Sequence, residues 1–188
     1  MTGRPGDSTG LRGARPAAGL VVRAATAADT RAIAEIRIAS WRATYPGMIP
    51  DATLERMDVD RDEARFGERV VDPRQRTIVV EDPPGRVAGF VMVGAARDDD
   101  ATGLGEVYAI YLAPSALGRG LGRALMDAAL AELAAAGLST VVLWVLTANA
   151  SARRFYERAG FRPDGAVRTL DFDGTPIEEI RCRRAESG

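Results

Sequence analysis

Residues 106–136 constrain the fold more than any other stretch, because a strand, a tight turn and a helix follow one another there directly. Both alternating sets of side chains in residues 107–112 are apolar or aromatic, which is typical of a strand at the centre of a sheet. Pro114 ends this strand, a glycine-rich turn follows, and an Ala- and Leu-rich helix is expected from about residue 120 to 136. A buried strand followed by a helix predicts an α/β domain.

The other elements change period along the chain. A short strand is expected from Leu20, Thr26 and Asp29 resemble a capping box, and residues 30–70 then carry apolar side chains at helical spacing. Beyond these residues the spacing is mainly that of strands, and the last two strands flank a hairpin signal at residues 173–174. The strands that this spacing predicts are 77–81, 87–95, 106–112, 140–146, 167–172 and 176–182, with a further helix at 150–159.

The composition is that of one soluble globular domain. Hydrophobic residues make up 46% of the 188 residues and charged residues 27%. We expect the domain to occupy residues 20–185 and residues 1–19, rich in Gly, Pro and Arg without periodicity, to form a disordered tail. The net charge of −1 disfavours nucleic acid as a partner, and the chain has no apolar run suited to a membrane or a secretory signal. A cytoplasmic protein without a nucleic-acid or membrane partner is the expectation.

Two missing residue types narrow the chemistry. The chain contains no histidine and no lysine, and Cys182 is its one cysteine. Nucleophile systems that depend on histidine, the phosphate-binding lysine of a P-loop, a lysine Schiff base and a multi-cysteine metal site are therefore excluded, and we expect no metal. Acid–base chemistry in this chain must use Asp, Glu, Tyr, Cys182 or water.

The turn at residues 117–123 (LGRGLGR) allows two interpretations. The first N–H groups of a helix are free and lie at its positive end, so glycines there let an anion approach closely, with Arg119 and Arg123 adding charge. Alternatively, the glycines only start the helix tightly and both arginines lie on a solvated face. The late position and the G-x-G-x-G spacing argue against a dinucleotide fingerprint.

The same turn resembles motif A of the GNAT superfamily of N-acetyltransferases, whose pattern is Q/R-x-x-G-x-G/A. Gly120 and Gly122 match the glycines of the pattern, and Leu117 stands where the family has Gln or Arg. The resemblance implies acetyl-CoA as the co-substrate, with its pyrophosphate on the amides of this turn. The residues that it implies as cofactor contacts are Leu117, Gly118, Arg119, Gly120, Leu121, Gly122 and Arg123.

A second resemblance lies at residues 149–161 (NASARRFYERAGF), which match the family's N-x-x-A-x-x-[FL]-Y-x-x-x-G-F segment. It implies that Asn149, Ala152 and Phe155 contact the cofactor, with Asn149 on the pantetheine arm, and that Tyr156 is the general acid to the leaving thiolate. The alternative from the residues alone is that Asn149 caps a helix and Tyr156 is a core aromatic.

The resemblance also implies a fold and an acceptor side. The fold is a GNAT-like mixed, mostly antiparallel sheet of six or seven strands with helices on both faces, in which strand 106–112 splays from strand 140–146. Backbone N–H groups of the three residues Ile110, Tyr111 and Leu112 would polarise the thioester carbonyl. Trp41 and Tyr45 fall in a region that borders the acceptor pocket, although packing on the sheet explains both equally well.

Glu106 is the candidate base in the absence of His and Lys, acting on the ammonium through water. A solvated carboxylate at the start of its strand is the alternative. The acidic run 98–100 would attract a cationic acceptor or simply lie in a solvated loop. Cys182 could carry an acyl group in a ping-pong route, but a buried structural thiol is favoured.

These observations predict an acetyl-CoA-dependent N-acetyltransferase that acts on a primary amine of a small molecule or peptide by direct transfer in a ternary complex. The alternative is a catalytically inactive domain of the same fold that binds acyl-CoA as a regulator. The acceptor stays open among amino acids, polyamines, aminoglycosides and peptide N-termini. The C-terminal hairpin could pair across a two-fold axis in a homodimer.

Overall fold

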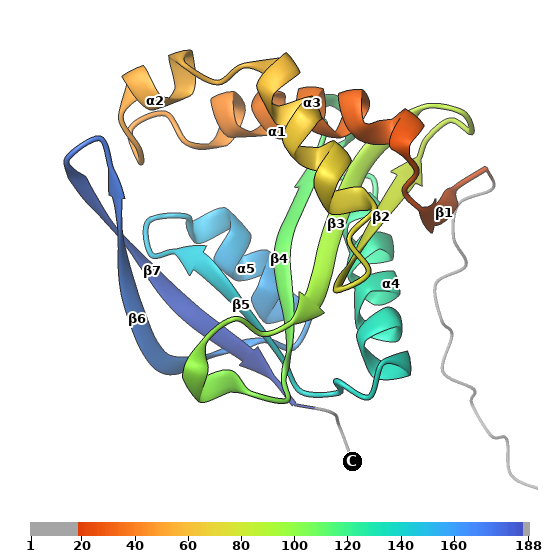
Figure 1. Cartoon of the computed structure of the whole chain (residues 1–188). Helices are drawn as coiled ribbons and strands as arrows, with labels where there is room; N and C mark the ends of the chain where they lie inside the picture. Colours follow the sequence, from red (N-terminus) through yellow and green to blue (C-terminus); the bar gives the residue numbers. More distant parts are fainter. Residues whose placement is uncertain (1–18, 186–188) are drawn as a thin grey trace, which may run out of the picture.

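The computed structural model describes residues 19–185 and contains seven strands and five α-helices (Figure 1). The predicted disordered tail therefore lies outside the described residues, apart from Gly19. The strands are β1 (Val21–Ala24), β2 (Gln75–Glu81), β3 (Val87–Ala95), β4 (Gly105–Leu112), β5 (Val141–Leu146), β6 (Arg162–Phe172) and β7 (Thr175–Arg184). The helices are α1 (Thr30–Thr44), α2 (Asp51–Glu55), α3 (Val59–Val70), α4 (Leu121–Ala135) and α5 (Ala150–Arg158).

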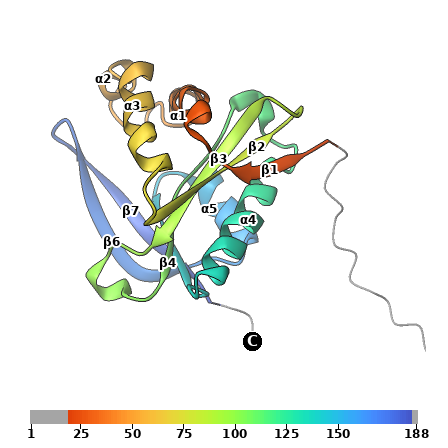
Figure 2. The same cartoon turned by 45° about the vertical axis from the view of Figure 1, so that its right-hand side comes forward.

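The seven strands form one sheet in the order β1-β2-β3-β4-β5-β7-β6. All neighbouring pairs are antiparallel except β4 and β5, which are parallel, so the predicted mixed, mostly antiparallel sheet is confirmed. Helices α1, α2 and α3 lie on one side of the sheet and α4 and α5 on the other (Figures 1 and 2). None of the helices in residues 19–185 is both long and apolar enough to span a membrane.

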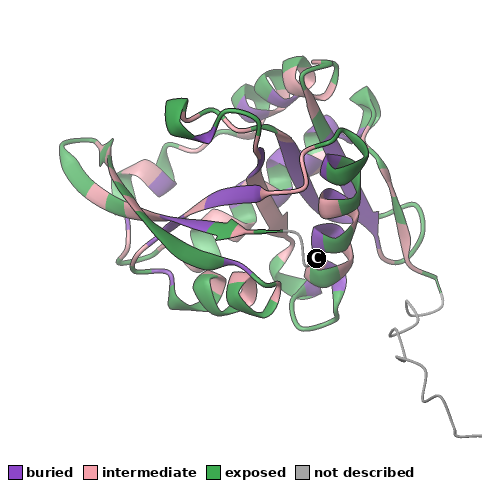
Figure 3. Cartoon of the chain, turned by 90° about the horizontal axis from the view of Figure 1, so that it is seen from below, coloured by how far each residue is buried: buried purple, intermediate pink, exposed green. Residues whose placement is uncertain are grey.

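Each face of the sheet has its own core. On the α4 side, Leu125, Met126 and Leu133 pack against strand residues such as Val91 and Val107. On the α1 and α3 side, the set packed together includes Ile33, Phe66, Val79, Phe90 and Met92. Both sides of β3 and the first half of β4 are therefore covered, and Figure 3 shows the buried residues concentrated in these central strands while the β6–β7 hairpin is largely exposed.

A bulge in β4 changes which of its side chains share a face. Met92 of β3 pairs with Ala109 and the next residue, Val93, pairs with Val107, so Tyr108 is an extra residue in β4. Tyr108 and Ala109 consequently both pack on the α1 side. The strict alternation predicted for residues 107–112 is wrong at this point because one inserted residue reverses the faces that follow it.

The parallel pair β4–β5 is short. Only Gly105 with Val141 and Glu106 with Val142 are paired, and the two strands separate beyond them. The predicted splay of these strands is therefore present. We call the space between β4 after Glu106 and β5 after Val142 the inter-strand gap.

The far end of the β6–β7 hairpin is tied to α2. Asp173, in the left-handed conformation at φ 56°, accepts a hydrogen bond from the Thr53 hydroxyl at 2.5 Å and forms an ion pair with Arg56. Below this link, Leu54 of α2 packs in one apolar cluster with Leu146 at the end of β5. The hairpin predicted around residues 173–174 is confirmed. Its tip lies beside α2, on the face of the sheet that α1 and α2 cover.

Candidate active site

The inter-strand gap is bordered from both faces of the sheet. The start of α4 and helix α5 border it on one face, and the end of α1 with the β6–β7 hairpin borders it on the other. Along the gap, β4 stays paired with β3 through Leu112, but its other edge has no strand partner within residues 19–185. Every second N–H and C=O group of β4 in this stretch is thus free to meet a ligand.

The turn before α4 is built by glycines for two different reasons. Gly118 and Gly120 have φ angles of 75° and 81°, which disfavour residues with a Cβ, yet a Cβ at either would meet no atom within 4 Å. Gly120 caps α4 in the left-handed conformation with open space beside it. Gly122 is different, because a Cβ there would lie 3.3 Å from Cε2 of Phe155 in α5. The turn therefore leaves the first N–H groups of α4 approachable and brings α4 close to α5.

The two arginines of this turn are paired with carboxylates. Nη2 of Arg119 lies 2.5 Å from Oδ2 of Asp82, and Nε of Arg123 lies 2.8 Å from Oδ1 of Asp127. Both arginine side chains are more than half exposed, and their contact with a cofactor stays a prediction. Exposed ion pairs of this kind exchange easily with another anion. Leu117 is 61% exposed at the same turn.

Asn149 caps helix α5. Its side-chain oxygen accepts a hydrogen bond from the N–H of Ala152 at 3.0 Å, and the residue is 4% exposed. The capping interpretation is thus confirmed. Contacts of Asn149, Ala152 and Phe155 with a cofactor stay predictions, although Ala152 and Phe155 lie in the part of α5 that packs on the α4-side core.

Tyr156 lies on α5 and packs against the core on the α4 side of the sheet. Its ring packs against Phe155 and Phe161 at centroid distances of 5.4 and 6.2 Å, as a core aromatic would. Burial raises the pKa of the Tyr156 hydroxyl, and the nearby ionisable groups of Tyr111 and Glu179 raise it further. Tyr156 therefore remains protonated at neutral pH, which is the form that a general acid requires.

Aromatic side chains from three elements face the gap on the α1 side. Trp41 packs edge-on against Tyr45 at 5.0 Å and lies 6.5 Å from Tyr111 and 6.4 Å from Phe172, by ring centroids. Burial raises the pKa of both Tyr45 and Tyr111. The buried Nε1 of Trp41 has no hydrogen-bond partner among the described residues. We call Trp41, Tyr45, Tyr111 and Phe172 the aromatic wall. Phe172 was missed in the sequence because it reaches Trp41 from the distant hairpin.

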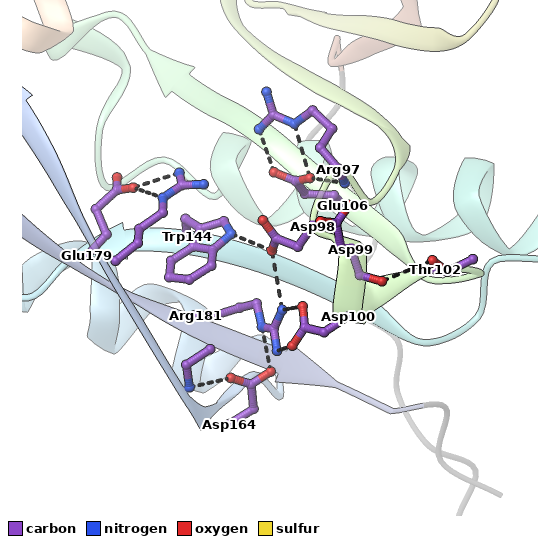
Figure 4. Close-up of polar contacts among 12 residues, drawn as sticks. Arg97, Asp98, Asp99, Asp100, Thr102, Glu106, Trp144, Asp164, Glu179 and Arg181 are labelled. Atoms are coloured by element: carbon purple, nitrogen blue, oxygen red, sulfur yellow. Dashed lines mark hydrogen bonds and ion pairs between the residues drawn. The ribbon is translucent and has the colours of Figure 1, made fainter.

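Glu106 is 1% exposed, so the alternative of a solvated carboxylate is wrong. Its carboxylate accepts hydrogen bonds from the backbone N–H, Nε and Nη2 of Arg97, at 3.0, 3.1 and 2.5 Å (Figure 4). The Arg97 guanidinium in turn lies 4.4 Å from the ring centroid of Tyr108. Glu106 thus holds the loop between β3 and β4 in place. If Glu106 acts as the base, as predicted, its carboxylate does so while it is buried and paired with Arg97.

The acidic run is not a free patch. Asp98 and Asp100 both bind Arg181 of β7, whose guanidinium also binds Asp164 of β6 (Figure 4). Asp98 additionally accepts a hydrogen bond from Nε1 of Trp144 in β5 at 2.9 Å. Arg181 thus holds two carboxylates of the run in place, and attraction of a cationic acceptor by the run stays a prediction. No local sequence signal marks Arg181 as their partner, because it lies 81 residues beyond Asp100.

Cys182 is buried in β7 opposite Leu143 of β5. Burial raises the pKa of its thiol, so the reactive thiolate is disfavoured. This placement agrees with a structural thiol.

Comparison with known proteins shows similarity over most of the described chain. The model of the acetyltransferase (GNAT) family matches residues 32–161. An uncharacterized N-acetyltransferase of Bacillus subtilis (strain 168), YuaI, is 33% identical over 132 residues, which are 70% of this chain and 75% of that protein. A mycothiol acetyltransferase of Tsukamurella paurometabola is 36% identical over 152 residues, which are 76% of this chain but 48% of that protein.

Solved structures show the same fold. The PaiA N-acetyltransferase of Thermoplasma acidophilum, in complex with coenzyme A, superposes with a TM-score of 0.70 at 18% identity, over 89% of this chain and 99% of that one. YncA of Salmonella typhimurium, a putative acetyltransferase with its cofactor acetyl-CoA, superposes with a TM-score of 0.66 at 23% identity, over 89% and 94%.

Proposed function

The chain belongs to the acetyltransferase (GNAT) family, and we propose that it moves the acetyl group of acetyl-CoA directly to the primary amine of a small molecule or peptide within a ternary complex. N-acetyltransferase activity with acetyl-CoA as co-substrate accords with the family match and with the relatives described above. The observation that carries the path of transfer is the inter-strand gap. It opens toward the α4 turn on one face and toward the aromatic wall on the other.

The α4 turn suits the pyrophosphate of acetyl-CoA. The free N–H groups after Gly118 and Gly120 lie at the positive end of a 15-residue helix, with open space at both glycines. Arg119 and Arg123 would leave Asp82 and Asp127 and bind phosphate oxygens, which accept bidentate contacts from arginine well. Exposed Leu117 offers an apolar contact in place of a Gln or Arg.

The reaction needs a polarised carbonyl and a protonated leaving group. The amine nitrogen attacks the thioester carbon, the C–N bond forms and the C–S bond breaks. The nitrogen gives up a proton and the sulfur gains one. N–H groups at the unpaired edge of β4, among residues 110–112, support polarisation of the carbonyl, and protonated Tyr156 supports transfer of a proton to sulfur. For the proton that leaves the nitrogen, we propose Glu106 as acceptor through a chain of waters, because Glu106 lies at the β4–β5 pair, four residues along β4 from Ile110.

Three measurements test this proposal. Calorimetry should show acetyl-CoA binding, and a panel of primary amines should contain at least one that releases free CoA thiol and gains the mass of an acetyl group. Initial rates at varied concentrations of both substrates should give intersecting double-reciprocal lines, as a ternary complex requires. Parallel lines would contradict direct transfer. Acetyl-CoA binding without release of CoA by any amine would favour the catalytically inactive, regulatory alternative.

A further inference from the structure

A carboxylate that sequence analysis did not single out lies on the acceptor side of the gap. Glu179 of β7 has a side chain that is 13% exposed. Its Oε2 atom binds Arg168 of β6, with Nε at 2.8 Å and Nη2 at 2.7 Å. The Arg168 guanidinium is stacked 4.2 Å from the ring centroid of Trp144 in β5. In Figure 4 the Glu179 carboxylate lies on the Trp144 side of the sheet, well apart from Glu106.

Strand register places Glu179 at the level where transfer is proposed. The last β4–β5 pair is Glu106 with Val142. Four residues farther along β5, Leu146 pairs with Glu179, and on β4, which contains the extra residue Tyr108, the corresponding residue is Tyr111. Glu179 therefore lies about 13 Å beyond Glu106 along the sheet, beside the β4 amides proposed to hold the thioester.

The surroundings of Glu179 leave one of its oxygens available. Oε1 accepts no hydrogen bond from any residue in the described part of the chain, although the side chain is mostly buried. The negative charge of Glu179 raises the pKa of Tyr45, Tyr111 and Tyr156, which shows that all three phenols lie within its field. Two of these belong to the aromatic wall and the third is the proposed acid.

We propose that Glu179 binds the ammonium group of the acceptor, and that the acceptor is a primary amine carried on an apolar arm that packs on the aromatic wall. The inference rests on the proposed acetyl transfer and extends it to the acceptor class. A carboxylate with one free oxygen is a strong partner for an ammonium ion. One face of Trp41 already carries the Arg37 guanidinium, 4.4 Å from the ring centroid, so the rings of Tyr45 and Tyr111 are left to attract the ammonium. The remaining surface of the wall is apolar, so it favours an apolar arm over a second charge.

The test uses 2-phenylethylamine as acceptor and 2-phenylethanol as its uncharged counterpart. Glu179→Gln keeps the shape of the side chain and removes its charge. Glu178→Gln is the matched control, because Glu178 is the exposed neighbour on the other face of β7. We expect Glu179→Gln to raise the KM for 2-phenylethylamine by about 10- to 100-fold, since a contact with a charged group is lost. The inhibition constant of 2-phenylethanol and the calorimetric affinity for acetyl-CoA should stay within about twofold.

Each result decides a different point. An unchanged KM in Glu179→Gln would overturn the role of Glu179. Equal weakening of the amine and the alcohol would also overturn it, because general damage to the pocket affects both probes. The proposed acceptor class would be overturned if the protein binds acetyl-CoA and acetylates a polycationic amine such as spermidine but does not acetylate 2-phenylethylamine. Failure to bind acetyl-CoA at all would instead contradict the proposed function.

Discussion

Two groups proposed for proton transfer occupy opposite environments. Tyr156 lies among aromatic rings and is held in its protonated form by burial. Glu106 is 1% exposed and is matched by the guanidinium of Arg97. A low-dielectric site favours a neutral acid in the first case and a paired carboxylate in the second. The chemistry available to each residue is therefore set by its nearest neighbour.

Replacement of Tyr156 by Phe removes the proton donor and keeps the ring. We expect kcat to fall roughly 10²- to 10⁴-fold, with little change in acetyl-CoA affinity. Since the pKa of the hydroxyl is raised, its acid form persists above the ordinary range, and wild-type activity should not decline near pH 10 through loss of this proton. Steady-state kinetics with a rate-limiting chemical step, with calorimetry as the control, make the comparison. Wild-type kcat in the variant would disprove the acid role.

Replacement of Glu106 by Gln separates its two roles. If Glu106 accepts the amine proton, kcat/KM should fall roughly 10²- to 10⁴-fold. Arg97→Gln is the control, because it breaks the same ion pair while leaving the carboxylate in place. Glu106 would have a structural role only if Glu106→Gln and Arg97→Gln lose the same thermal stability and the pH profile of kcat/KM stays that of the wild type.

Residues with local partners were predictable, and residues with distant partners were not. The capping box of Thr26 and Asp29 is confirmed because both members lie within one turn. The pairing of Glu106 with Arg97 spans nine residues and a loop, and that of Asp98 with Arg181 spans 83. No periodicity or spacing encodes such contacts, since they depend on which strands become neighbours in the sheet.

At the scale of elements, the glycine turn and helix α4 form one unit. The helix begins at the predicted place because Gly120 takes the left-handed conformation before it. Its close approach to α5 depends on Gly122, a packing reason that the sequence pattern alone does not reveal. Strand β6 also starts earlier than predicted, at Arg162 rather than Val167. Its first residues are exposed, and the irregular register near Pro163 hides the alternation expected of a strand.

The substitution Gly120→Glu should prevent cofactor binding by this unit. It places a carboxylate and a side chain where phosphates are proposed to bind, so repulsion and steric overlap act together. We expect acetyl-CoA affinity to fall at least about tenfold by calorimetry, since unfavourable contacts replace several hydrogen bonds.

Gly137→Glu controls for backbone strain in that experiment. Gly137 has a φ of 79° and lies just beyond the other end of α4, and a Cβ there also meets open space. The control should lose stability to a similar extent and keep its affinity for acetyl-CoA. Equal affinities in the two variants would move the phosphate site away from the turn.

At the scale of the whole molecule, ion pairs join the edge strand β1 to its neighbours. Arg23 of β1 binds Asp29 before α1, at 2.8 Å, and Glu81 of β2, at 2.7 Å. These contacts connect the first strand, the first helix and the second strand. The mixed, mostly antiparallel sheet was expected from the family resemblance, but the link between α2 and the hairpin tip could not be, because Thr53 and Asp173 are 120 residues apart.

The Asp29 contacts predict a loss of stability in acid. Arg23 and the N–H of Thr26 lower the pKa of Asp29 from 3.8 to about 2. The unfolded chain therefore takes up this proton first as the pH falls. The stabilisation, roughly 2 kcal/mol, is complete above about pH 4 and lost as the pH falls toward 2.

Asp29→Asn should remove this contribution at pH 7 and make thermal stability less sensitive to acid over that window. Thermal unfolding followed by circular dichroism between pH 7 and pH 2.5 gives the comparison. Glu35→Gln serves as the control, because Glu35 is exposed on α1 in a simple i,i+4 pair with Arg31. Equal acid sensitivity in Asp29→Asn and the wild type would show that other carboxylates cause the loss.

The shortness of the β4–β5 pairing also has a mechanical consequence. A sheet resists bending where its ladder is continuous, and here four strands on one side and three on the other share only two residue pairs, both at one end. Those pairs act as a hinge, so the free ends of β4 and β5 can change their separation with little loss of hydrogen bonding. A cofactor arm that lies between β4 and β5 has amide groups of its own, which would form the hydrogen bonds that the two strands do not form with each other. Occupancy should then stiffen the whole sheet and slow amide exchange in β5, far from the phosphates.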